Sequence, residues 1–81
     1  MHEYAVIQTL VETVLETLRK RPPCTVREIH VSVGSESGYV EDSLRASYEI
    51  LAQGTPLGLA RLVLVVRGGQ AVTLERLVLE E

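Results

Sequence analysis

The sequence predicts a small α/β fold of the α+β kind, in which two helices pack on a mixed sheet of three or four strands. Two amphipathic stretches alternate with apolar stretches rich in Val and Leu, as such an architecture requires. The chain has 81 residues, enough for one core but not for a second domain. The core must be aliphatic, because the chain has no Phe or Trp and only three Tyr.

The first helix is expected from Ala5 to Arg19, where apolar residues recur at the spacing of a helix face. Basic residues at its end complement the helix dipole, and Pro22-Pro23 stops it. An alternative is that the residues before Val6 form a short strand and that the helix begins slightly later. Cys24 follows in a turn. As the only cysteine it can form neither an internal disulfide nor a cysteine zinc cluster, and we expect a partly buried thiol in a reduced protein.

The next stretch, Val26 to Gly34, alternates apolar and polar residues and is predicted to be a strand. His30 falls on its polar face, where we expect an exposed surface histidine, with a metal ligand as the alternative. Residues 34–38 form a polar loop bounded by glycines. No Lys-Ser/Thr follows, so this loop is a strand-to-helix connection rather than a phosphate-binding loop. The second helix is expected from Val40 to Gln53, with Gly54 as its terminator.

Two strands are predicted in the last third of the chain. Leu59 to Arg67 is apolar without alternation, so both of its faces should be covered. The segment Arg67-Gly68-Gly69-Gln70 is expected to be a tight hairpin turn, because Gly-Gly tolerates the positive φ angles of such turns. Ala71 to Leu79 is then the returning strand, with a bulge or a change of exposed face near Glu75-Arg76.

Composition argues against several classes of function. The chain carries 8 Lys plus Arg against 11 Asp plus Glu, a poor footprint for a nucleic-acid partner, and it lacks aromatic platforms for single strands. No apolar run is long enough to span a membrane, and the start does not resemble a secretory signal, so we expect a cytoplasmic protein. An enzyme is not expected either, because no nucleophile is paired with a base and there are only two His.

The triplet Met1-His2-Glu3 carries a metal-binding hypothesis. His2 is too bulky for ready removal of the initiator methionine, so we expect the chain to keep Met1. The α-amine, the His2 backbone nitrogen and the His2 imidazole then close two adjacent chelate rings on a metal. The Glu3 backbone nitrogen or its carboxylate completes the set, and four such donors in one plane suit Ni(II) or Cu(II). Without support from the rest of the chain, the alternative is a strand or a frayed end.

Together with the first helix, the Gly34-to-Gly38 segment, the second helix and Gly54-Thr55, this triplet resembles the HypA-type nickel metallochaperones. The resemblance covers nearly the whole chain. It implies insertion of nickel into [NiFe]-hydrogenase or urease, with a HypB-type GTPase and the large subunit of the nickel enzyme as partners. It also implies that nickel is held by the Met1 amine, the His2 backbone nitrogen and side chain, and the Glu3 backbone nitrogen. The Glu3 carboxylate would instead orient the site or mediate contact with a partner.

One departure from this family is large. The family normally carries a zinc module with two Cys-x-x-Cys pairs between the last two strands, where this chain has Arg67 to Gln70. We therefore expect residues 1–81 to form a single nickel-binding domain without zinc. The alternative function is an interaction module that acts through protein contacts without tight metal binding. Because two helices cannot cover both faces of so apolar a sheet, we also expect a face or edge shared with a second copy, as in a homodimer, or with another partner.

Overall fold

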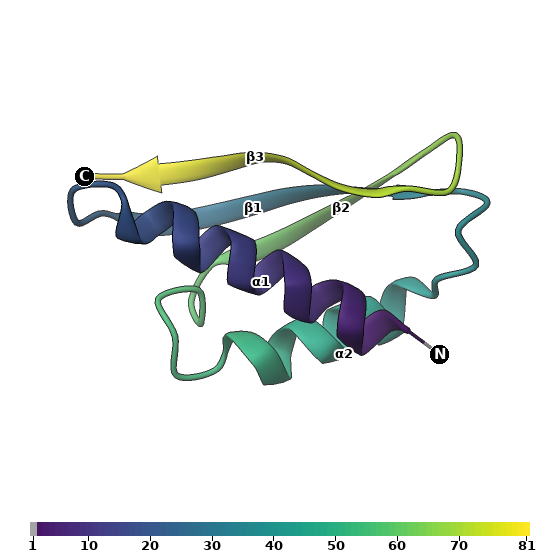
Figure 1. Ribbon diagram of the computed structural model, residues 1–81, viewed down its shortest axis with the longest axis horizontal. Helices are drawn as coiled ribbons and strands as arrows, with labels where there is room; N and C mark the ends of the chain where they lie inside the picture. Colours follow the sequence, from purple (N-terminus) through teal and green to yellow (C-terminus); the bar gives the residue numbers. More distant parts are fainter. Residues whose placement is uncertain (1) are drawn as a thin grey trace.

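The computed structural model describes residues 2–81, and its two helices lie on one face of a three-stranded sheet (Figure 1). The central strand β1 is parallel to β2 and antiparallel to β3. The elements in chain order are α1 (Glu3–Arg19), β1 (Thr25–Gly34), α2 (Glu41–Ala52), β2 (Arg61–Arg67) and β3 (Val72–Glu80). The predicted α+β class, the mixed sheet and the order helix, strand, helix, strand, strand are confirmed.

The core lies between the helices and the inner face of the sheet, and it is aliphatic as expected. Its largest fully buried side chains are Ile7, Val14, Ile29, Val31, Leu44 and Leu57. Burying each such side chain contributes about 1.5–3 kcal/mol. Tyr48 of α2 adds a polar anchor, because its hydroxyl donates a hydrogen bond to the Leu57 carbonyl at 3.0 Å. Burial raises the pKa of Tyr48 to about 12.

Helix α1 begins earlier than the sequence pattern suggested. It starts at Glu3 rather than Ala5, and no strand precedes it among the described residues. The first helical hydrogen bond runs from the Val6 N–H to the His2 carbonyl, at 2.9 Å. An acidic residue in the first turn favours this early start, because its charge opposes the positive end of the helix dipole.

The connection between β2 and β3 is not the expected hairpin. The strand order is β2-β1-β3, so β2 and β3 do not pair, and the connection crosses the carboxyl end of β1 (Figure 1). Three backbone bonds pin this crossing: Gly34 N to Ala71 O at 2.8 Å, Ser35 N to Arg67 O at 2.7 Å, and Glu36 N to Gly69 O at 2.8 Å. A Cβ at Gly34 would lie 2.3 Å from the Gly69 oxygen, so β1 must end in glycine. Gly68 and Gly69 therefore lie in a segment that crosses the end of β1, and not in a tight turn between two paired strands.

The outer face of the sheet carries no helix, so the expectation that both faces of β2 are covered is wrong within this chain. The side chains of Leu62 and Leu64 face the core, whereas Val63 and Val65 lie on the outer face. Val65 is 36% exposed. The unbroken apolar run of β2 therefore reflects one covered face and one face that stays open.

The predicted irregularity in the last strand is confirmed. The register between β1 and β3 shifts after His30 and leaves Glu75 as an extra residue in β3. The Glu75 carboxylate accepts two hydrogen bonds from the Arg67 guanidinium of β2, at 2.6 and 2.9 Å. These bonds, together with the positive charge of Arg67, hold the pKa of Glu75 below its usual range. The pair joins the two edge strands across β1 on the outer face.

Candidate metal site at the start of the two helices

His2 stands at the start of α1 with its side chain exposed. It occupies the N-cap position, and its side chain makes no capping hydrogen bond within the described helix. The imidazole is therefore accessible to a metal ion from solution. Met1, whose amine is the first expected donor, lies outside the described residues.

The backbone N–H of Glu3 also makes no hydrogen bond within the helix. The first four N–H groups of a helix precede any carbonyl that they could reach, and here these belong to residues 2–5. A metal could therefore replace the Glu3 amide proton without breaking a helical hydrogen bond. The carbonyl of the same peptide group, that of His2, would continue to accept the Val6 N–H. The positive end of the helix dipole favours the negative charge that such a nitrogen acquires.

The Glu3 carboxylate has a different environment from the His2 ring. Glu3 is only 5% exposed, and its Oε2 accepts the backbone N–H of Val40 at 3.3 Å. Val40 is the N-cap of α2, and a valine side chain has no oxygen with which to cap the helix. The carboxylate thus lies at the start of both helices, where two positive dipole ends favour its charge. This geometry favours the orienting role for the carboxylate over direct ligation.

The loop after β1 brings Val40 to this position. Ser37 shapes it, because its Oγ accepts the Tyr39 N–H at 3.2 Å, and Gly38 adopts a φ of +80° that suits glycine. Directly after Val40, Glu41 and Asp42 add two exposed acidic side chains in the first turn of α2. The charge of Glu41 is offset by Arg45, whose Nε donates to Glu41 Oε2 at 3.1 Å.

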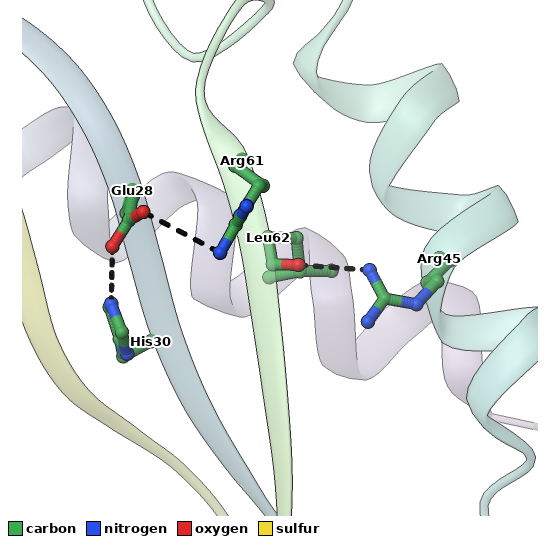
Figure 2. Close-up of polar contacts among 5 residues, drawn as sticks. All are labelled: Glu28, His30, Arg45, Arg61 and Leu62. Atoms are coloured by element: carbon green, nitrogen blue, oxygen red, sulfur yellow. Dashed lines mark hydrogen bonds and ion pairs between the residues drawn. The ribbon is translucent and has the colours of Figure 1, made fainter.

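The second histidine is engaged by its neighbours. His30 Nε2 lies 2.8 Å from Glu28 Oε1, and Arg61 Nη2 lies 3.7 Å from the other carboxylate oxygen (Figure 2). The hydrogen bond to His30, with the charge of Arg61 as a smaller cause, holds the pKa of Glu28 below its usual range. The His30 side chain is 17% exposed, so the expectation of an exposed surface histidine is wrong. Among residues 2–81, no group of three or more His, Cys, Asp or Glu side chains is arranged to hold a metal.

Sequence reasoning missed two of these contacts for different reasons. Glu28 and His30 are two residues apart on one strand and so share a face, a signal that the sequence does contain. The contact between Glu3 and Val40 spans 37 positions and has no local signal. Cys24 is half-buried in the loop before β1, as expected. Neither described helix is long and apolar enough to cross a membrane.

Comparison with known proteins adds independent information. Residues 1–73 match the family model described as "HypA: Hydrogenase/urease nickel incorporation, metallochaperone, hypA". Three similar curated proteins are each named "Hydrogenase maturation factor HypA". The one from Thermomicrobium roseum is 38% identical over 55 residues, 68% of this chain and 42% of that protein. The one from Beijerinckia indica is 31% identical over 71 residues, 88% of this chain and 63% of that protein. The one from Methanopyrus kandleri is 35% identical over 69 residues, 85% of this chain and 49% of that protein.

A solved structure shares the fold. It is described as the solution structure of the Ni metallochaperone HypA from Helicobacter pylori, and it superposes with a TM-score of 0.70 at 18% identity. The match covers 94% of this chain and 72% of that one. The chain spans about half the length of the curated relatives that it matches.

Proposed function

Because the chain belongs to the HypA family of hydrogenase/urease nickel-incorporation metallochaperones, we propose that it binds Ni(II) at Met1, His2 and Glu3 and passes the ion to a nickel enzyme. The family is one of metallochaperones and not of enzymes, so nickel is the cargo and no catalytic residues are assigned. The observation that carries the proposal is the exposed His2 side chain directly before a helix whose first amide nitrogens have no helical acceptor.

The proposed donors are the Met1 amine, the backbone nitrogen and imidazole of His2, and the backbone nitrogen of Glu3. Two deprotonated backbone nitrogens would neutralise the charge of Ni(II), and a planar nitrogen-rich set suits this ion. The Glu3 carboxylate, held by the Val40 N–H, would fix the direction in which the chain enters α1.

Binding and release then depend on protons. Each donor must lose a proton or stay unprotonated to bind, so affinity rises with pH. Because the His2 side chain is exposed, another protein's ligands could replace these donors one at a time. Such ligand exchange transfers the ion without any change in its oxidation state.

We further propose the partners that the family implies, namely a HypB-type GTPase and the large subunit of a nickel enzyme such as [NiFe]-hydrogenase, in the cytoplasm. The short crossing at residues 67–71 stands between the last two strands, where the family normally carries its zinc module. This domain would then act without zinc. The alternative function remains an interaction module that kept the fold and does not bind metal tightly.

Nickel titration by calorimetry separates these two functions. The chain with a free Met1 amine is compared with a chain that carries extra residues ahead of Met1, which removes the amine donor from the site and leaves residues 2–81 unchanged. We expect saturable binding of a single equivalent by the first chain and none by the second, with identical circular dichroism spectra. Absence of saturable binding by the first chain would favour the interaction module. Equal binding by both chains would place the metal elsewhere.

A further inference from the structure

The loop between β1 and α2, residues 34–40, joins distant parts of the chain. It leaves the carboxyl end of β1, contacts the crossing between β2 and β3, and ends beside the start of α1 (Figure 1). Every backbone N–H from residue 34 to residue 40, except that of Gly38, donates a hydrogen bond within the described chain. Most connecting loops are mobile, whereas a loop with its amides engaged in this way is held in one shape.

The first half of the loop is fixed by the crossing. The Ser35 N–H donates to the Arg67 carbonyl at 2.7 Å, and the Glu36 N–H donates to the Gly69 carbonyl at 2.8 Å. A Cβ at Gly34 would lie 2.3 Å from the Gly69 oxygen, so only glycine lets the two segments come this close. The starting point and the direction of the loop are therefore set by the sheet.

The second half is shaped by two residues of its own. The Ser37 N–H donates to the Gly34 carbonyl at 3.0 Å, and the Ser37 Oγ accepts the Tyr39 N–H at 3.2 Å. Serine commonly makes such a bond to the backbone two residues on, and the bond fixes a turn. Gly38 adopts a φ of +80°, and a Cβ there would meet nothing within 4 Å. Glycine is thus needed at position 38 for the backbone angle and not for space.

The far end of the loop delivers the Val40 N–H to Glu3. The Glu3 Oε2 accepts this N–H at 3.3 Å, although the two residues are 37 positions apart. This distance is near the upper limit for a hydrogen bond, so a displacement of Val40 by about 0.5 Å would break it. The bond therefore depends on the shape that Ser37 and Gly38 give to the loop.

We propose that Ser37 and Gly38 are positioning residues for the nickel site, which act on metal affinity through the bond between Val40 and Glu3. This inference rests on the proposed function, in which the Glu3 backbone nitrogen is a donor. The side chain and the backbone nitrogen of Glu3 share one Cα, so a fixed carboxylate restricts the direction of the nitrogen. Loss of an outer partner of a metal ligand typically costs about 10–100-fold in affinity. Ser37 acts at one further remove, and we expect an effect of about three- to tenfold.

Calorimetric nickel titration of the chain with a free Met1 amine tests this role. Ser37→Ala should weaken binding by about three- to tenfold, and Gly38→Ala should act in the same direction. Ser37→Thr keeps an Oγ and should retain the affinity of the parent chain. The matched control is Ser35→Ala, which removes an exposed hydroxyl from the same loop and should leave the affinity unchanged. Circular dichroism at the titration temperature must show every variant fully folded, so that lost stability does not contribute.

A double-mutant cycle asks whether the effect passes through Glu3. In a Glu3→Ala chain the bond to Val40 is already absent, so adding Ser37→Ala should cause no further loss of nickel affinity. A merely structural role for the serine would lower affinity equally in both backgrounds. An equal loss in both would therefore overturn the proposed route through Glu3.

Hydrogen exchange followed by NMR gives a readout without nickel. The Val40 amide should exchange faster in Ser37→Ala, as it should in Glu3→Ala, whereas the Leu44 amide, which donates to the Val40 carbonyl at 3.0 Å inside α2, should not change. If the parent chain does not bind nickel, the proposed function fails and this inference falls with it. If the parent chain binds nickel and Ser37→Ala binds it as tightly as Ser35→Ala does, this inference alone is overturned.

Discussion

The molecule contains two histidines, each close to a glutamate, and the two pairs differ in what their backbones do. His30 and Glu28 lie on β1, where the strand pairs with a neighbour on each side and the imidazole is held by the carboxylate at 2.8 Å. His2 and Glu3 lie at the start of α1, where the imidazole is exposed and the backbone nitrogens are free. There the carboxylate accepts the backbone N–H of Val40 instead.

If nickel binds as proposed, a histidine beside a carboxylate is not enough to make a nickel site. In the sheet pair, the His30 imidazole and the Glu28 carboxylate bind each other, and strand pairing engages the backbone of β1. Arg61 adds a positive charge nearby. At the helix start, the backbone nitrogens of His2 and Glu3 have no helical acceptor, and the His2 imidazole is exposed. The availability of donors therefore separates the two pairs, and their amino-acid types do not.

The largest expected effect is on nickel binding, and it separates the pairs directly. His2→Ala removes the imidazole donor and should weaken nickel binding by at least about 100-fold, more than the loss of an outer partner usually costs. His30→Ala, the matched control, should leave the affinity unchanged. Calorimetric titration of both variants measures this. If His30→Ala weakened binding as much as His2→Ala did, the distinction between the pairs would fail.

The next effect concerns the buried carboxylate. Glu3→Ala leaves the Val40 N–H without its acceptor and should lower the free energy of unfolding by about 1–3 kcal/mol. Glu3→Gln keeps an oxygen acceptor and loses only the charge at the two helix ends, so its cost should be about 0.3–1 kcal/mol. Urea unfolding at neutral pH measures both.

The same two variants test whether the carboxylate is a ligand. Both keep the Glu3 backbone nitrogen, so nickel binding should persist in each and fall by about tenfold in the alanine variant, in which orientation is lost. Loss of binding in both variants would show that the carboxylate coordinates the metal.

The smallest effect belongs to the sheet pair. The pKa of Glu28 is lower in the folded chain than in the unfolded one, chiefly because of its hydrogen bond to His30. Glu28 therefore stabilises the fold above the usual pKa of a glutamate, and this contribution is lost as pH falls through its lowered folded pKa. The urea midpoint of unfolding should fall less between neutral and acidic pH in Glu28→Gln than in the parent chain. Glu12→Gln, on the exposed side of α1, should behave like the parent chain at both pH values.

Much of the fold could be predicted because it rests on local periodicity. The apolar spacing located α2 and β1 to within a residue or so, and the slip near Glu75 located a real bulge. The order of the strands could not be predicted in this way. Gly68-Gly69 suits a hairpin and equally suits a passage over the end of β1, and only the long-range pairing of β1 with β3 decides between them.

In the candidate site, too, the features that depend on local sequence could be predicted, and those that depend on long-range packing could not. The donor series at Met1, His2 and Glu3 depends on covalent order, so the sequence alone suggests it, and it stays a prediction until metal is added. The burial of Glu3 against Val40 depends on how α1 and α2 pack, and no local pattern reports it. The covered state of His30 follows from its spacing to Glu28 on one strand, and it could have been inferred.

The most direct test of the account is NMR of the nitrogen-labelled chain during nickel titration. A planar low-spin Ni(II) complex is diamagnetic, so resonances near the metal stay sharp. We predict that the backbone amide proton signal of Glu3 disappears at saturation, because its nitrogen binds the metal, and that the resonances of the His2 ring nitrogens shift. The His30 ring should not change. Persistence of the Glu3 amide signal, with shifts at His30 and Glu28 instead, would contradict the account.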